Sequence, residues 1–358
     1  MVMRRLKYRS APSVRSPTNG RGIMVRWFPS SLSFFVPSSF IPPPFPMSSN
    51  QDSAVGLLLV GHGTRDVVGR AELLATSRLV ADEWPGPVEP CFLELAEPTI
   101  AAGLARLVER GSQRVVVAPL LLFAAGHAKR DVPDAVAAAA LAHPGFKWRQ
   151  AAHLGCHAAI VELSAMRFRE AIDEAGSEDE GIFDGSVGEV GGRDSGAPRP
   201  TVAALGSDRS SLTPHPSSLL VLVGRGSLDA AATAEMHQFA RLRSECTGVE
   251  MIEVCFAAMA EPLLGDCLAR LVERRTSDLA HIRQVVVEPH LLFAGELLAE
   301  IRRTAARYAG RCPEWDWRIT EHLGPDDLLA QAIVQRAKEA ASDWESATLG
   351  AAGNVDRQ

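Results

Sequence analysis

The sequence predicts an α/β protein of two tandem domains, each a small parallel β-sheet flanked by helices. Two observations lead to this prediction. Uninterrupted apolar runs alternate with segments of helical periodicity, which is typical of parallel strands covered on both faces. The pattern also occurs twice, because VGLLLVGHGTRD at residues 55–66 is matched by SLLVLVGRGSLD at residues 218–229. A chain of 358 residues has room for two domains of ordinary size.

Strand and helix signals alternate through the first half. The apolar strand at 54–60 enters the turn GHGTRD, and helical spacing over about 67–82 predicts a helix. After a strand at 88–94, Glu97-Pro98 is expected to open a second helix that ends near Gly111, since proline is tolerated early and glycine caps late. The remaining expected elements are a strand at 113–122, a helix starting at Asp131 and Pro133, a strand at 148–154 and a helix at 157–175.

The second half repeats this order after a segment of different composition. Residues 176–217 are Gly-rich and partly acidic without periodicity, which is typical of a flexible linker. Strands are expected near 219–223, 249–256, 283–288 and 316–320. We therefore predict one domain at 54–175, a linker at 176–217, a second domain at 218–345 and a disordered tail at 346–358.

Residues 1–50 differ from the rest of the chain. They contain seven Lys and Arg residues but no Asp or Glu, and their second half is rich in Ser, Pro and Phe. A transit peptide, a signal peptide and a start codon set too early are three possible explanations. The prolines at 37 and 42–44 argue against a secretory signal, and Met47 lies just before the first strand. We favour the early start codon, expect this segment to be disordered, and expect a cytoplasmic protein, or an organellar one if the segment is a transit peptide.

Composition argues against several functional classes. A net charge of −6 gives no reason to expect nucleic acid, and no apolar run approaches the ~20 residues of a membrane span. The six cysteines include no C-x-x-C pair, which favours reduced thiols over disulfides or an iron–sulfur cluster. No Walker A or G-x-G-x-x-G motif opens either half, so a nucleotide cofactor is not expected.

Three chemically capable side chains occur only in the first copy of the repeat. They follow the first, second and third strands, whose carboxyl ends share one sheet edge, where ligands bind in such folds. The apolar sequence around them is kept in the second copy, which predicts one working site and one silent site. His62 is replaced by Arg225, Glu94 by Ala258, and His127 by Glu296 or Leu297, depending on a one-residue gap.

Each of these residues also has an ordinary structural explanation. His62 could be a turn histidine, Glu94 could cap the next helix, and His127 could be an exposed loop residue. Together, two imidazoles and a carboxylate can hold a divalent first-row metal ion and accept protons. Their joint loss from the second copy favours a metal site formed by His62, Glu94 and His127.

Basic residues flank the predicted site. Arg65, Lys129 and Arg130 are candidates for pairing with substrate carboxylates, although each could equally be a solvated surface charge. Arg225 could add anion contacts from the second half. His153 and His322 occupy matching H-L-G positions in both halves, so a structural role is expected for them.

The segments VGHGTRD, CFLELAEP and PLLLFAAGHAKRDVP resemble the CbiX/SirB group of sirohydrochlorin chelatases, the class II chelatases. Thr64 and Val132 replace the usual Ser and Ile. The resemblance covers about residues 55–345 in two copies, as in the long two-domain form of the family. It implies that His62 and His127 are the metal-binding and catalytic histidines and that Glu94 assists them.

The resemblance implies insertion of Co²⁺, or next Fe²⁺, into the tetrapyrrole sirohydrochlorin for cobalamin or siroheme; Ni²⁺ stays open. No cofactor beyond that metal substrate is expected, and the two fused halves suggest a monomer with an internal pseudo-dimer. One alternative is a metal or tetrapyrrole carrier without insertion activity. Another is a phosphoryl-transfer enzyme with His62 as nucleophile, although Gly61 stands where that chemistry needs an arginine.

Overall fold

The structure is a computed structural model that describes residues 54–123, 127–173, 217–249 and 251–352; the side chains of residues 127, 128, 343 and 345–352 are not described. The described residues belong to one compact unit. The expected N-terminal extension and almost all of the expected linker lie outside the described residues.

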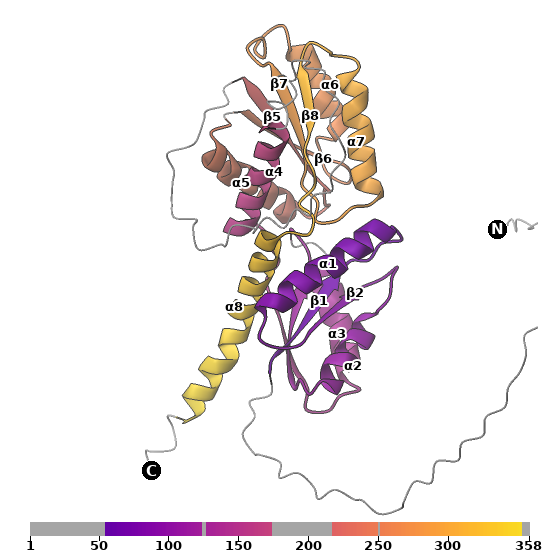
Figure 1. Cartoon of the computed structure of the whole chain (residues 1–358), viewed down its shortest axis with the longest axis vertical. Coiled ribbons are helices and arrows are strands. Elements are labelled where there is room, and N and C mark those ends of the chain that lie inside the picture. Colours follow the sequence, from indigo (N-terminus) through magenta and orange to yellow (C-terminus); the bar gives the residue numbers. More distant parts are fainter. Residues whose placement is uncertain (1–53, 124–126, 174–216, 250, 353–358) are drawn as a thin grey trace, which may run out of the picture. The chain divides into compact units, whose positions relative to one another are not determined.

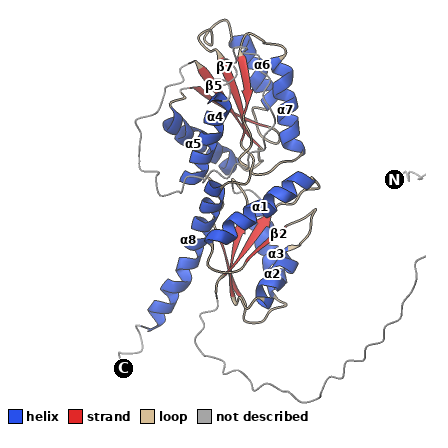
Figure 2. Ribbon diagram, viewed as in Figure 1, coloured by secondary structure: helices blue, strands red, loops and turns tan. Residues whose placement is uncertain are grey.

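Two four-stranded parallel sheets form the framework, which confirms the predicted α/β class (Figure 2). In each sheet the first strand of the half is central and the second lies at the edge, giving the orders β2-β1-β3-β4 and β6-β5-β7-β8. The strands are β1 (Gly56–Gly61), β2 (Val88–Phe92), β3 (Arg114–Pro119), β4 (Lys147–Gln150), β5 (Ser218–Gly224), β6 (Met251–Phe256), β7 (Gln284–Pro289) and β8 (Asp316–Ile319).

Burial explains why the central strands have no polar alternation. Every residue of β1 and of β5 is buried, because helices cover both faces of each sheet. Val115, Val116 and Val117 of β3 are fully buried beside them. The aliphatic cores hold the sheets so that the turns after the strands are fixed at one edge.

The helices follow the predicted order with small shifts. They are α1 (Val67–Glu83), α2 (Ile100–Glu109), the π-helical turn η1 (His127–Asp131), α3 (Val132–Ala140), α4 (Ala158–Asp173), α5 (Ala230–Thr247), α6 (Leu264–Arg274), α7 (Glu296–Ala309) and α8 (Asp327–Ala352). Helix α8 continues past residue 345, where the tail was expected to begin, and residues 353–358 lie outside the described part.

The predicted start of the second helix was wrong. Glu97-Pro98 is a cis peptide bond in the loop before the helix, and α2 begins only at Ile100. Thr99 is the N-cap, and its Oγ1 accepts a hydrogen bond from the Ala102 amide at 3.3 Å. A threonine in extended conformation satisfies a free amide of the first turn, which proline at this place does not.

The last helix of each half packs mainly on the sheet of the other half (Figure 1). Helix α4 contacts β7, β8 and α5, whereas α8 contacts β3, β4 and α1. A buried polar network reinforces the first of these contacts: Arg243 Nε donates to Ser164 Oγ at 2.8 Å, and Ser164 Oγ in turn donates to Glu288. The two halves are therefore joined by exchanged helices.

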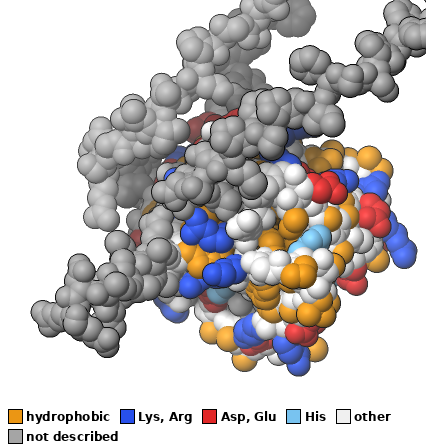
Figure 3. All heavy atoms as spheres, turned by 90° about the horizontal axis from the view of Figure 1, so that it is seen from below, with side chains coloured by type: hydrophobic (Ala, Val, Ile, Leu, Met, Phe, Trp, Pro, Cys, Tyr) orange, Lys and Arg blue, Asp and Glu red, His pale blue; other side chains and the backbone are white. Residues whose placement is uncertain are grey.

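On the face seen in Figure 3, the described surface has no large patch of one charge, because Lys and Arg side chains are interspersed with Asp and Glu. Among the described residues, no helix combines the length and apolar character that a membrane crossing requires.

Candidate active site at the edge of the first sheet

The turn after β1 brings His62 next to Glu94. Leu93 N donates to Gly61 O at 2.9 Å, and Glu94 N donates to His62 O at 3.1 Å, so the backbone pairs beyond the ends of β1 and β2. Gly63, the residue after His62, has φ +104°, and a Cβ at this position would overlap the carbonyl oxygen of Glu94. Glycine is therefore required for the two chain segments to approach this closely.

The side chains of His62 and Glu94 form a direct polar pair. His62 Nε2 lies 3.3 Å from Glu94 Oε1, and the two side chains are 26% and 51% exposed. An imidazole and a carboxylate that both reach solvent can meet a metal ion or a proton arriving from outside. Two of the three residues predicted for the site are thus in contact.

The rest of the G-H-G-T-R-D motif directs the chain into α1. Thr64 Oγ1 accepts from Asp66 N at 3.0 Å, and Asp66 Oδ1 accepts from the amides of Val68 and Gly69 at 2.8 and 3.1 Å. Asp66 is therefore the N-cap of α1. Ser227 Oγ likewise accepts from Asp229 N, and Asp229 Oδ1 accepts from the Ala231 amide at the start of α5, which explains why the second copy keeps G-S-x-D after losing the histidine.

His127 is the first residue of η1, directly after the loop that follows β3. Single π-helical turns are common at functional sites. The side chain of His127 and residues 124–126 are not described, so its approach to His62 stays a prediction. Among the side chains that are described, no three His, Cys, Asp or Glu groups cluster as metal ligands.

The basic residues flanking the site differ in their surroundings. Arg65, Arg130 and Arg225 are exposed. Lys129 Nζ instead lies 2.6 Å from Asp229 Oδ2, at the N-cap of α5 in the second half. The hydrogen bond from Lys129, followed by that from the Ala231 amide, lowers the pKa of Asp229.

The second half keeps the backbone of the site without its side chains. Gly226 has φ +90°, a Cβ there would overlap the carbonyl oxygen of Ala258, and Ala258 N donates to Arg225 O at 3.0 Å. The turn is thus repeated, with an arginine for the imidazole and a methyl group for the carboxylate. Arginine stays protonated and can neither bind a metal ion nor accept a proton.

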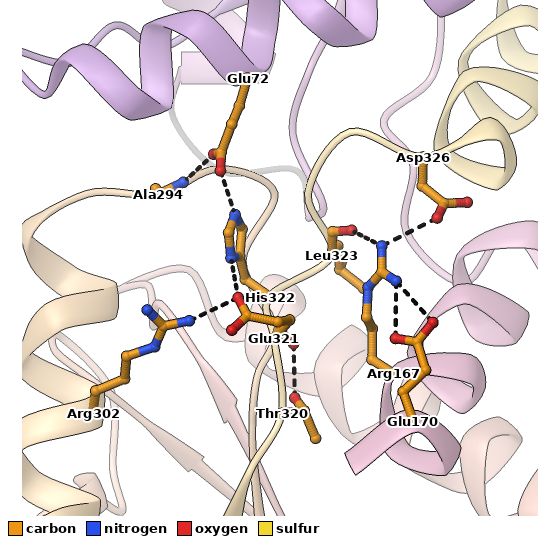
Figure 4. Close-up of polar contacts among 10 residues, drawn as sticks. All are labelled: Glu72, Arg167, Glu170, Ala294, Arg302, Thr320, Glu321, His322, Leu323 and Asp326. Atoms are coloured by element: carbon orange, nitrogen blue, oxygen red, sulfur yellow. Dashed lines mark hydrogen bonds and ion pairs between the residues drawn. The ribbon is translucent and has the colours of Figure 1, made fainter. Parts of the chain in front are cut away.

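Two histidine–glutamate pairs join the halves reciprocally. His153 Nε2 lies 2.8 and 2.9 Å from the two carboxylate oxygens of Glu235. His322 Nε2 lies 3.1 Å from Glu72 Oε1, and Glu72 Oε2 accepts from the Ala294 amide at 2.6 Å (Figure 4). Sequence reasoning gave no role to the glutamates, although their matched repeat positions were a signal: 72 + 163 = 235.

The CbiX family model matches residues 56–171 and again residues 219–340. The chain belongs to the CbiX family. The predicted resemblance and its two-domain form are confirmed, because each match contains one sheet.

Curated proteins with similar sequences include sirohydrochlorin chelatases. A sirohydrochlorin cobaltochelatase of Priestia megaterium is 24% identical over 286 residues, 79% of each chain. A sirohydrochlorin ferrochelatase of the same organism is 26% identical over 293 residues, covering 82% of this chain and 92% of the relative. SirB from Bacillus subtilis, solved with Fe³⁺, has the same fold, with a TM-score of 0.62 at 24% identity over 82% of this chain and 98% of SirB.

Proposed function

We propose that this protein is a sirohydrochlorin chelatase, a lyase that inserts a divalent metal ion into sirohydrochlorin. Co²⁺ is our first choice of metal substrate and Fe²⁺ the second. The main support for this proposal is the His62–Glu94 pair, which lies at the ligand-binding edge of the sheet in only one of the two copies of the CbiX repeat.

The reaction needs a base as much as a metal ligand. One divalent ion enters the macrocycle while two pyrrole N–H protons leave, so the overall charge balances. A neutral imidazole can hold the ion or take a proton near neutral pH. We assign metal binding to His62 and His127, and to Glu94 the role of assisting ligand and proton acceptor through its contact with His62.

The surface beside the pair suits a flat macrocycle with carboxylate arms. Leu95 follows Glu94 at φ +61° and is 54% exposed, and Val67 and Val68 are exposed at the start of α1. We assign Arg65, Arg130 and Arg225 to the carboxylates, and also Lys129, whose ammonium group has further N–H donors beside the one that contacts Asp229.

The phosphoryl-transfer alternative lacks support at position 61. Gly61 stands where this chemistry needs an arginine, and a Cβ there would meet Cδ1 of Leu73, so the Leu73 side chain would have to move to admit one. We further propose that the protein is a monomer, because two halves with exchanged helices already supply the pairing that a one-domain protein would need a second copy to make.

The deciding experiment mixes the protein with metal-free sirohydrochlorin and Co²⁺, Fe²⁺ or Ni²⁺ in turn and follows the absorption spectrum. We expect protein-dependent formation of the metallated spectrum, fastest with Co²⁺. Binding of metal or tetrapyrrole without any acceleration of insertion would instead identify a carrier and overturn the proposal.

A further inference from the structure

The loop that leads to His127 is tied to the segment after β4. Leu154 N donates to Leu121 O at 3.0 Å, and Gly155 N donates to Leu122 O at 2.6 Å. The H-L-G segment, residues 153–155, therefore fixes the backbone as far as Leu122, five residues before His127. His153, the first residue of that segment, is in turn held by both carboxylate oxygens of Glu235.

A second contact holds the same loop from its other side. Lys129, two residues after His127, pairs with Asp229 at 2.6 Å. Asp229 is the N-cap of α5 and Glu235 lies in its second turn, so one helix of the second half contacts both flanks of His127.

The mirror arrangement is incomplete. Glu72 of α1 holds His322, and Leu323 N and Gly324 N donate to Leu291 O and Leu292 O, as in the first half. In the repeat alignment, however, the slot of Lys129 falls on Leu298 or Ala299, neither of which can form an ion pair. Among the described residues, contacts on both sides therefore occur only around the loop that leads to His127.

We propose that Glu235, assisted by Asp229, is a positioning residue that holds the His127 loop for metal insertion. This inference rests on the proposed function. The second half has no counterpart of the His62–Glu94 pair, but its helix α5 supports the site of the first half by holding this loop in place. Catalytic groups depend on such bracing, because a displacement of about 1 Å can cost about a hundredfold in rate.

The repeat supplies a matched control. Glu235→Ala and Glu72→Ala each delete one histidine–glutamate pair between the halves, and Glu72→Ala also removes the acceptor for Ala294. We expect both to lower Tm by about 2–4 °C. Glu235→Ala should lower kcat at least about tenfold with KM for sirohydrochlorin within about twofold, whereas Glu72→Ala should keep kcat within about twofold.

Glu235→Gln should restore kcat to within about threefold of wild type, because the amide oxygen still accepts from His153. If Glu235→Ala does not fold, Asp229→Asn decides: asparagine still caps α5 but releases Lys129, and kcat should fall at least about threefold at unchanged Tm. Equal kcat losses in Glu235→Ala and Glu72→Ala, or unchanged kcat in Glu235→Ala or in the deciding Asp229→Asn, would overturn the inference.

Titration with Co²⁺ alone separates this inference from the proposed function. Wild-type protein that binds Co²⁺ but inserts none refutes the chelatase function, and the inference is then judged on Co²⁺ affinity. Glu235→Ala should weaken that affinity at least about fivefold and Glu72→Ala should not. If both variants bind Co²⁺ like wild type, or if wild type binds none, the inference is wrong.

Discussion

At the scale of single residues, the two halves differ in the side chains that their matched turns after β1 and β5 carry. Both turns have a glycine at positive φ against a carbonyl oxygen, and both cap the next helix with an aspartate. Only the first presents His62 and Glu94. The difference between the copies is therefore one of side-chain chemistry on a common backbone.

Replacing either histidine should remove insertion without unfolding the protein. We expect His62→Ala and His127→Ala each to lower kcat/KM at least about a hundredfold, through lost metal binding and proton transfer. Tm should change little, because both residues lie in a turn or at the start of a short helical turn. Steady-state assays with thermal melts check this, and near-normal turnover in either variant would refute the assigned site.

The two turn glycines allow a comparison of strain with function. Gly63→Ala and Gly226→Ala should each cost about 1–3 kcal/mol, because both place a Cβ on a carbonyl oxygen at positive φ. Only Gly63→Ala should also abolish insertion, since it separates His62 from Glu94. Denaturant melts and turnover assays decide; comparable activity in the two variants would contradict the assignment of the working site to the first half.

At the scale of elements, β7 and the first residue after it carry buried polar side chains where β3 and its next residue carry apolar ones. Glu288 and His290 replace Ala118 and Leu120 in the repeat, and both are about 1% exposed. Glu288 pairs with Arg243 and Ser164, whereas both ring nitrogens of His290 are buried without a hydrogen-bond partner. The His290 ring packs on Phe239, with ring centroids 4.2 Å apart.

His290 should make the protein sensitive to acid. Burial, and then the charge of Arg243, lowers the pKa of His290 to about 3, from 6.5. The neutral ring therefore supports folding above pH 6.5, and stability is lost as pH falls toward 3, because the unfolded chain takes up the proton. We expect His290→Leu, the residue of the first copy, to flatten the slope of unfolding free energy by about 1.4 kcal/mol per pH unit between pH 6 and 4.

Urea melts of both proteins across this pH range measure the slope. His143→Leu is a suitable control, since His143 lies in the turn after α3 and is only half-buried. Parallel pH profiles for wild type and His290→Leu would show that His290 does not contribute.

At the scale of the whole molecule, exchanged helices make the halves interdependent. Leu329 and Ile333 of α8 are buried in the same core cluster as Leu57 and Leu59 of β1. The first sheet without α8 would expose that core to water, at roughly 25 cal/mol for each Å² of apolar surface.

A fragment of residues 52–175 should therefore fail to fold alone. We expect low solubility and no cooperative thermal transition, because α8 is absent and α4 has lost its sheet. Co-expression with residues 216–358 should restore a soluble complex, measured by gel filtration and circular dichroism. A fragment 52–175 that melts cooperatively by itself would show that the exchange is not required for stability.

The sequence by itself determined the fold class, the repeat and the difference between its copies. Continuous apolar strands and helical spacing are local patterns, and His62, Glu94 and His127 stand out because matched positions in the second copy differ. The order of strands and turns also predicts that these three residues share one sheet edge, since parallel strands end together, and the structure places His62 and Glu94 in contact.

Only the tertiary structure decided which helix covers which sheet. An apolar helix face specifies that it is buried but not against which of two similar sheets, so the exchange of α4 and α8 left no signal in the periodicity. The partners of Glu72, Glu235 and Lys129 followed from that exchange, because ion pairs between distant segments depend on geometry rather than on sequence spacing.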